Sequence, residues 1–400
     1  MGVPGGTDMG RFAGLVLIAG WLLAAGESAP AAEKTTAARP GKARSGPYDS
    51  AAECKRCHAA IHASWSESAH AHAATTSSFR RSMEATMKLS SDPARTRKDC
   101  IECHAPTTRV TGDLDLKNPV SAEGVTCDFC HTVKEVGLER AGQPFTLDPG
   151  PVKRGPFAYS RSFPGHRAEY SFLHRGSPLL CAACHEFANE KGFPLLVTYT
   201  GWKEGPFPAR GIACQDCHMA LIPGKIADDD LLQKQGPRVI NLHRLVGGSS
   251  MSQLNRGVRL KIESFSATST VAEVRVAVAN EGAGHPIPGG LPTKSLVLVL
   301  GAENASGALE NPQETIYRRE ILDAQGAPLN TLPEMFVSGA KAGLDSRLKP
   351  GETRHESFRV ALRGGSRAVV ARLEYRDATD TGAPSKSSVI TQERRELKGR

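Results

Sequence analysis

Cys54-Lys55-Arg56-Cys57-His58 is the first of five pentads in which two cysteines are separated by two residues and followed at once by a histidine. The other four are Cys100-Ile101-Glu102-Cys103-His104, Cys127-Asp128-Phe129-Cys130-His131, Cys181-Ala182-Ala183-Cys184-His185 and Cys214-Gln215-Asp216-Cys217-His218. The chain has 10 cysteines, and every one lies in a pentad. Disulfides, zinc sites and a thioredoxin-like redox pair would each explain paired cysteines, but none of them requires the histidine. The pentads therefore decide the chemistry and the fold of the stretch that contains them.

This spacing is the attachment signature of c-type haem. The two thiols can reach the two vinyl groups on one edge of a porphyrin, and the imidazole of the next residue then lies under the ring, where it can bind iron. We therefore predict five covalently attached haem c groups, with all ten cysteines as thioether anchors. The predicted proximal iron ligands are His58, His104, His131, His185 and His218.

The group that occupies the sixth coordination position of each iron distinguishes an electron carrier from an enzyme. A second histidine gives a six-coordinate iron that exchanges electrons with little rearrangement, whereas an open position lets a small molecule bind. Of the 13 histidines, the eight outside the pentads suffice for five distal ligands. The candidate distal ligands are His70, His166, His174, His243 and His285, with His72 as a substitute for His70.

The other histidines and two pairs of side chains have simpler explanations. His62 is expected to pack beside a proximal ligand, and His355 to lie on the surface. Met83 and Met87 could offer a sulfur ligand, although methionines at helical spacing usually pack. Arg80 and Arg81 could pair with haem carboxylates or a substrate anion, or lie on a solvated face.

The composition of the 400 residues limits the class of protein. With 40% hydrophobic and 23% charged residues, the chain is neither disordered nor a polytopic membrane protein. A net charge of +8 would by itself keep nucleic acid among the partners. About ten haem carboxylates would cancel that charge, and no nucleic-acid-binding motif is present, so we expect no nucleic-acid binding.

The N-terminus has the pattern of a secretory signal. Arg11 precedes an apolar run over residues 12–25, and the small residues at 28–32 suit a cleavage site. The run is shorter than the about 20 residues that a spanning helix needs. We expect a signal peptide over 1–32, a flexible leader over 33–47, and a mature protein without a stable membrane span. Its expected location is the periplasm, or the outer surface after further export.

The hydrophobic pattern changes near residue 255. Residues 48–254 contain many Gly, Pro and Ser residues that interrupt regular structure. A helix is expected from Ala51 through Trp65. Porphyrins would supply the apolar core that these residues lack. After residue 255, apolar and polar residues alternate, as in Val258 to Ile262 and Val274 to Val278. We predict a multidomain chain: a mainly α and loop multihaem cytochrome domain over 48–254, followed by an all-β immunoglobulin-like sandwich over 255–400.

Several stretches resemble the haem segments of multihaem cytochromes related to cytochrome c-554. They are CHAAIHASWSESAHAHA at 57–73, GVTCDFCH at 124–131, LLCAACH at 179–185 and GIACQDCHM at 211–219. NLHRLVGG at 241–248 and GHPIPGG at 284–290 are similar to stretches in family members that carry a C-terminal β-domain. The resemblance implies closely packed haems, mostly with two histidine ligands, and favours His70, His243 and His285 as distal ligands. A fifth pentad and the β-domain depart from the family's tetrahaem pattern.

Three functions remain open. The first is a pentahaem electron carrier in the periplasm, serving other cytochromes or membrane quinol-oxidising complexes. The second is a multihaem oxidoreductase that acts on a small nitrogen or sulfur compound at one open-site haem, although no Cys-x-x-Cys-Lys pentad occurs. The third is a subunit of an extracellular cytochrome assembly. The carrier is the favoured hypothesis, and no catalytic residue is assigned.

Overall fold

The computed structural model describes residues 2, 46–140, 142–158, 162–163, 165–227, 239–248, 250–378 and 386–397. Apart from residues 2, 46 and 47, the expected signal peptide and leader lie outside the described residues. Contacts divide the chain into Met1–Ala38 and Arg39–Arg400, and the helices and strands of the described residues belong to the second unit. Within the described residues, no helix has the length and apolar character that crossing a membrane requires.

Four of the five pentads lie in helices. They are in α4 (Pro93–His104), α7 (Cys127–Thr132), α9 (Leu179–His185) and α11 (Cys214–His218). Residues three or four apart share one face of a helix, so each helix presents its two thiols and the following imidazole on the same side. Three of these helices end at the pentad histidine itself.

The first pentad is divided between two helices, α1 (Ala51–Lys55) and α2 (Ala59–Ser66). His58 stands between them with φ −111° and ψ 46°, which is not helical. Its ring Nδ1 donates to the carbonyl of Ile226 at 2.5 Å. The continuous helix expected from Ala51 is therefore wrong: the chain bends where its histidine turns toward a distant carbonyl.

The other elements before residue 250 are short, except for α3 (Ser77–Leu89), which packs beside α4. The helices are α5 (Thr108–Thr111), α6 (Pro119–Ala122), α8 (Phe172–Arg175), α10 (Thr198–Lys203) and the 3-10 helix η1 (Pro208–Arg210). The strands form small pairs or triplets: β1 (Val133–Val136) with β2 (Phe145–Leu147); β3 (Val152–Gly155), β4 (Ser162–Phe163) and β5 (His166–Tyr170); β6 (Glu186–Ala188) with β7 (Pro194–Val197); and β8 (Leu221–Pro223) with β9 (Val239–Asn241).

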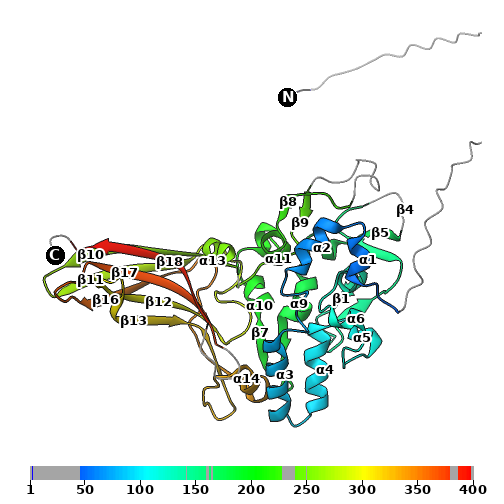
Figure 1. Ribbon diagram of the computed structural model, residues 1–400, viewed down its shortest axis with the longest axis horizontal. Coiled ribbons are helices and arrows are strands. Elements are labelled where there is room, and N and C mark those ends of the chain that lie inside the picture. The colour runs from blue at the N-terminus through cyan, green and yellow to red at the C-terminus, as the bar shows by residue number, and fades with distance from the viewer. Residues whose placement is uncertain are drawn as a thin grey trace, which may run out of the picture. The chain divides into compact units, whose positions relative to one another are not determined.

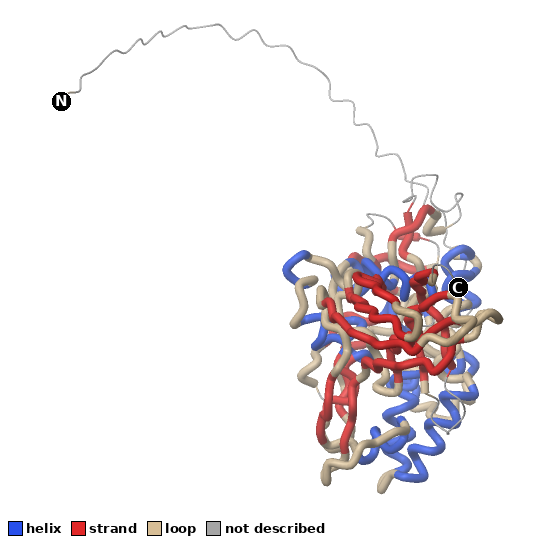
Figure 2. The backbone as a smooth tube through the Cα atoms, turned by 90° about the vertical axis from the view of Figure 1, so that its left-hand side faces the viewer, coloured by secondary structure: helices blue, strands red, loops and turns tan. Residues whose placement is uncertain are grey.

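The region after residue 250 is built mainly from strands, as expected (Figure 1). After α13 (Met251–Gly257), the strands β10 (Val258–Ala267), β11 (Val271–Asn280) and β16 (Thr353–Ala361) form one antiparallel sheet in the order β10-β11-β16. A second antiparallel sheet has the order β13-β12-β17-β18, from β12 (Lys294–Glu303), β13 (Leu309–Tyr317), β17 (Ala368–Asp377) and β18 (Lys386–Glu396). Figure 2 looks at the strand region from its far end, so the long strands, drawn red like all strands, run toward the viewer.

One apolar core joins the two sheets. Val258, Leu260 and Ile262 of β10 are buried while Arg259 and Lys261 between them are exposed, which confirms the alternation read from the sequence. The central strand β12 is buried along most of its length. Side chains from both inner faces fill the space between the sheets, as in a sandwich.

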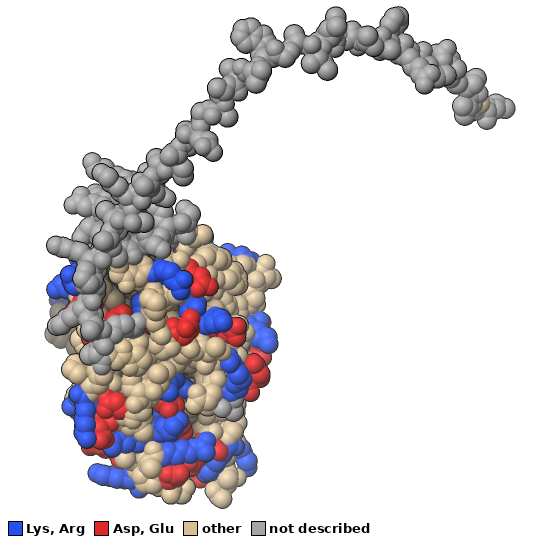
Figure 3. Space-filling model, turned by 90° about the vertical axis from the view of Figure 1, so that its right-hand side faces the viewer, with Lys and Arg blue, Asp and Glu red and all other residues tan. Residues whose placement is uncertain are grey.

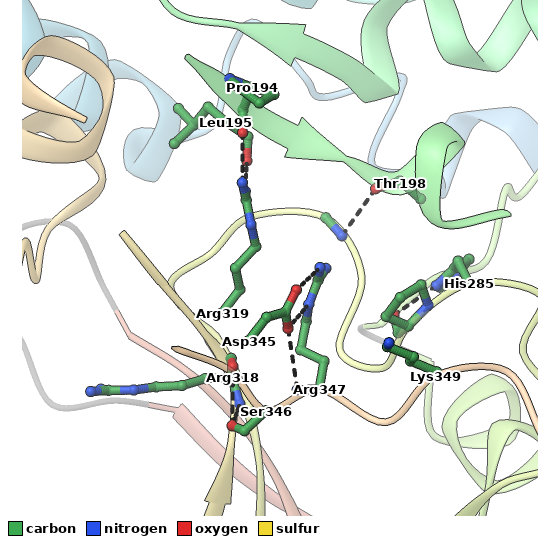
Figure 4. A network of polar contacts seen from close by, with 12 residues as sticks. Pro194, Leu195, Thr198, His285, Arg318, Arg319, Asp345, Ser346, Arg347 and Lys349 are labelled. Atoms are coloured by element: carbon green, nitrogen blue, oxygen red, sulfur yellow. Dashed lines mark hydrogen bonds and ion pairs between the residues drawn. The ribbon is translucent and has the colours of Figure 1, made fainter. Parts of the chain in front are cut away.

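A hairpin with a helix extends from the strand region into the pentad region. It consists of β14 (Arg319–Leu322), α14 (Leu332–Ser338) and β15 (Lys341–Asp345). Ile321 and Met335 pack against Phe193 and Leu195 in one apolar cluster. Arg319 donates to the carbonyls of Pro194 and Leu195, and the amide of Gly290 donates to Thr198 Oγ1 at 3.2 Å (Figure 4). The two regions therefore form one unit through buried contacts.

Candidate cofactor-binding site

All five pentads line one cavity of about 1980 Å³. Pockets for drug-sized ligands have volumes of roughly 300–1,000 Å³, so this cavity has room for a much larger group or for several groups. The ten pentad cysteines and the five pentad histidines all belong to its wall. The five candidate distal ligands line it as well: His70, His166, His174, His243 and His285. His72 and His355 do not line it.

The cysteines of different pentads come into contact without forming disulfides. All ten thiols are free. Three pairs of thiols lie close enough to shift one another's pKa values: Cys54 with Cys127, Cys103 with Cys184, and Cys181 with Cys214. The pentads are therefore neighbours in the order first to third, second to fourth and fourth to fifth. Burial raises the pKa of the Cys130 thiol to about 12, and that thiol is also close enough to Cys181 and Cys184 to raise their pKa values. This proximity links the third pentad to the fourth.

Four pentad histidines face a second histidine across the cavity. The distances between ring centres are 6.1 Å for His58 and His166, 6.2 Å for His70 and His185, 6.4 Å for His131 and His243, and 6.3 Å for His218 and His285. A metal ion about 2 Å from one nitrogen of each of two opposed imidazoles separates the ring centres by roughly 6–6.5 Å. All four pairs have this spacing.

Backbone carbonyls orient most of these rings. Nδ1 of His58, His131 and His218 lies 2.5 Å from the carbonyl oxygens of Ile226, Arg154 and Val246, respectively. A carbonyl only accepts a hydrogen bond, so Nδ1 carries the proton and Nε2 keeps its lone pair for a metal. The same arrangement holds for His104 with Ala73, His166 with Arg167, His243 with Asn241 and His285 with Pro286.

His174 is the exception among the candidate distal ligands. Its ring lies 5.2 Å from that of His131, closer than the other four opposed pairs. Its Nε2 lies 2.8 Å from the carbonyl oxygen of Cys130, so Nε2 carries the proton and is turned away from a metal. Its Nδ1 is buried without a hydrogen-bond partner among the described residues. The geometry therefore favours His243, and not His174, as the histidine opposite His131.

Burial favours the neutral form of several imidazoles that line the cavity. It lowers the pKa of His131 to about 3 and that of His185 to about 4, with neighbouring histidines adding to both shifts. Burial also lowers the pKa values of His70, His104, His166, His243 and His285. Neutral imidazole is the form that binds iron, so these rings are ready to act as ligands at neutral pH.

His104 differs from the other pentad histidines. Among the described residues, no histidine ring faces it; instead the Phe79 ring of α3 stacks on it, with centres 3.9 Å apart and planes 16° apart. Phe79 and Met83 of the same helix pack against Ile101 and Ala105. Met83 and Arg81 line the cavity, whereas Met87 and Arg80 do not.

The residues present fit haem c. Each pentad offers two thiols and an imidazole, and four imidazoles have a partner at the spacing of a shared iron. The wall is large and mainly apolar, as a buried porphyrin requires. The carbonyls that orient the rings could not be found from the sequence, because every residue has a backbone carbonyl and its type does not show which one accepts a hydrogen bond. The sequence also did not single out Phe79 or Lys294, another residue of the wall.

Known proteins resemble this chain in sequence over one segment and in fold over most of its length. Residues 53–132 match the family described as cytochrome c554 and c-prime. Cytochrome c-554 of Nitrosomonas europaea is 33% identical over 89 residues, which are 21% of this chain and 38% of that protein, so the match spans less than half of that relative. A penta-heme cytochrome c552 from Thermochromatium tepidum superposes with a TM-score of 0.71 at 22% identity, covering 88% of this chain and 99% of that one. The expected resemblance to cytochrome c-554-related proteins is confirmed, and the shared fold includes the strand region.

Proposed function

We propose that this chain is a pentahaem c-type cytochrome that passes single electrons between redox partners in the periplasm. The observation that carries the proposal is the set of four opposed imidazole pairs, spaced for a shared iron, in a cavity that all five pentads line. When bound, haem iron with two imidazole ligands supplies one-electron exchange with little rearrangement. The chain's own residues hold, orient and enclose that group.

The cysteines and histidines divide these tasks. The ten pentad cysteines would form the thioether links, and the pentad histidines would bind iron from the proximal side. Opposite them we assign His166 to His58, His243 to His131, His70 to His185 and His285 to His218. The backbone carbonyl oxygens of Asn241 and Pro286 help by accepting hydrogen bonds from Nδ1 of His243 and His285.

The contacts between pentads suggest a path for electrons. The first pentad touches the third, the third lies near the fourth, and the fourth touches both the second and the fifth. Haems anchored there would be close neighbours in the same order. The haem of the fourth pentad would then be the branch point, with the first, second and fifth haems as ends where partners exchange electrons.

The chain has four segments in this proposed function, and its partners are redox proteins. Residues 1–32 are a signal peptide and 33–47 a leader, 48–254 form the cytochrome domain, and 255–400 form an immunoglobulin-like sandwich. The partners are other cytochromes or membrane quinol-oxidising complexes. On the face shown in Figure 3, basic and acidic side chains are interspersed, and such a face does not favour nucleic acid.

The mass of the mature protein tests the number of haems. We expect the mass of the polypeptide plus five haem c groups, and one group fewer in a variant with Cys214→Ala and Cys217→Ala. A Ser64→Ala variant, which leaves all ten cysteines, is the control and should keep all five. A mass without added macrocycles, or with cystine bridges, would contradict the proposal.

A second candidate function rests on His104. Because no histidine faces this ring among the described residues, a haem on Cys100 and Cys103 would keep a position open for a small nitrogen or sulfur compound. The chain would then be a multihaem oxidoreductase that receives its electrons through the other four haems.

Electron paramagnetic resonance tests whether the haem at His104 has an open position, which the second function requires and the carrier does not. We expect the oxidised protein to show four low-spin haems and one high-spin ferric haem, and we expect cyanide or nitric oxide to remove the high-spin signal. Met83→Ala should leave that signal unchanged, because Met83 packs in an apolar cluster. Five low-spin signals, one of them converted to high spin by Met83→Ala, would instead show sulfur ligation and favour the carrier alone.

A further inference from the structure

His285 lies on a loop of the strand region, although it faces the histidine of the fifth pentad. The loop joins β11, which ends at Asn280, to β12, which begins at Lys294. The ring of His218, the last residue of α11, lies across the cavity with its centre 6.3 Å from that of His285 and its plane at 10°. The two proposed ligands of one iron therefore come from the two regions of the chain, and their spacing depends on how the loop is held.

Asn280 holds the loop from the side of the strands, and its side chain is fully buried. Its Nδ2 donates to the carbonyl oxygens of His285 at 3.0 Å and Leu348 at 3.1 Å, and its Oδ1 accepts from the amide of Ala283 at 3.0 Å. Both donors of the carboxamide are thereby used, and turning the group over would place its oxygen against two carbonyl oxygens. One side chain thus ties the backbone of His285 to the strand region in a single orientation.

The residues after His285 are held as well. Ile287 and Leu348 exchange two backbone hydrogen bonds, of 2.9 and 3.0 Å, and both side chains belong to the core between the sheets. Gly289 packs against the imidazole, because a Cβ on this residue would lie 2.7 Å from Cε1 of His285. The ring therefore has little room to turn away while the loop keeps this shape.

The helix α10 of the pentad region packs directly on the same loop. A Cβ on Gly201 would lie 2.5 Å from Cδ of Pro286, which is too close for any side chain at this position of the helix. Thr198, at the start of α10, accepts a hydrogen bond through Oγ1 from the amide of Gly290 at 3.2 Å (Figure 4). The loop that carries His285 is therefore held by buried contacts with both regions.

We propose that Asn280 is the positioning residue for His285, and that the strand region thereby controls whether the iron at the fifth pentad is six-coordinate. This inference rests on the proposed function. A loop that is already fixed lets the imidazole reach the iron without a further loss of conformational freedom. Without the carboxamide, the loop gains conformations in which His285 is off the iron, while the thioether links at Cys214 and Cys217 keep the haem in place.

The test is the spin state of the haems and the rate of cyanide binding in the intact holoprotein. We expect Asn280→Ala to convert one low-spin haem to high spin and to speed cyanide binding at that haem at least about tenfold, the factor that corresponds to the net loss of a single hydrogen bond. Asn280→Asp should act in the same way, since a carboxylate has no N–H to donate to the two carbonyls. Asn304→Ala, which removes the hydrogen bonds of a turn between β12 and β13, is the matched control and should change neither readout.

Gly201→Ala tests the same dependence from the pentad region. Alanine favours a helix more than glycine does, so α10 itself should not be weakened, while the added methyl group displaces Pro286. We expect the same haem to become high spin. Adding Asn280→Ala to His285→Ala should change the spectrum no further, because the ligand that Asn280 positions is already absent.

The outcomes separate this inference from the proposed function. Unchanged spin states and cyanide rates in an Asn280→Ala protein that keeps five haems would overturn the inference and leave the pentahaem proposal intact. If Asn280→Ala does not fold, the same result in Gly201→Ala overturns it. A further high-spin haem in the double variant would show that Asn280 acts on another haem, and would overturn the inference too. If His285→Ala itself leaves every spin state unchanged, the proposed function is wrong in pairing His285 with His218.

Discussion

Replacing His243 with alanine is expected to convert one low-spin haem to high spin, whereas replacing His174 with alanine should leave every haem in its original spin state. Both histidines line the cavity and both lie near His131. They differ in which ring nitrogen is free. His243 donates its Nδ1 proton to the carbonyl of Asn241, at 2.7 Å, which leaves Nε2 available to a metal.

His174 has the opposite arrangement, because its Nε2 donates to the carbonyl of Cys130 at 2.8 Å. Its ring centre is also 5.2 Å from that of His131, which is too close for an iron between them, while His243 stands at 6.4 Å. His174 is therefore expected to support the backbone of the third pentad, and its loss should reduce stability without freeing an iron position.

The measurement is electron paramagnetic resonance of both oxidised variants, with mass spectrometry to confirm that each keeps all its haems. Cyanide should bind the new high-spin haem of His243→Ala. A high-spin haem in His174→Ala, with an unchanged spectrum in His243→Ala, would reverse the assignment. Added imidazole should restore the low-spin spectrum of His243→Ala, which a general loss of structure would not allow.

The pentads made most of the candidate site predictable, because the spacing of their cysteines and histidine carries its own chemistry. All five histidines proposed as distal ligands line the cavity, but which one faces which pentad was not predictable. His70 and His185 are far apart in sequence, and only the path of the chain brings their rings to 6.2 Å. The ring tautomers depend on carbonyls such as those of Ile226 and Val246, and main-chain atoms leave no mark in a sequence.

The strand region could be predicted from the alternation of apolar and polar residues, because the same alternation buries one face of each strand when the region folds. A strand with one buried face must place apolar residues at every second position, and β10 does so from Val258 to Ile262. The insertion from β14 to β15 was not foreseen. Its role depends on Arg319, and a sequence does not show whether an arginine is buried or exposed. The break at His58 was also missed, because helical spacing continues through it while a contact with a distant carbonyl bends the backbone.

Arg319 provides the second large expected effect: Arg319→Ala should lower the free energy of unfolding by roughly 2–4 kcal/mol, since charged hydrogen bonds are lost and buried carbonyls are left unsatisfied. Its guanidinium is buried and donates to the carbonyl oxygens of Leu195 at 2.9 Å and Pro194 at 2.8 Å. It also lies 5.5 Å from the centre of the Phe193 ring. One side chain thus connects β14 to β7 and, through β7, to the pentad region.

The neighbouring Arg318 is the matched control, because the same substitution one residue earlier removes an exposed side chain. Arg318 points away from Arg319 and pairs with Glu320 at 2.9 Å on the surface, where such pairs contribute about 0–1 kcal/mol (Figure 4). Thermal unfolding followed by circular dichroism should show a Tm lower by several degrees for Arg319→Ala and little change for Arg318→Ala. Equal shifts in the two variants would show that the buried contacts of Arg319 do not join the two regions, and Arg319→Lys, which keeps the charge but fewer donors, should fall between them.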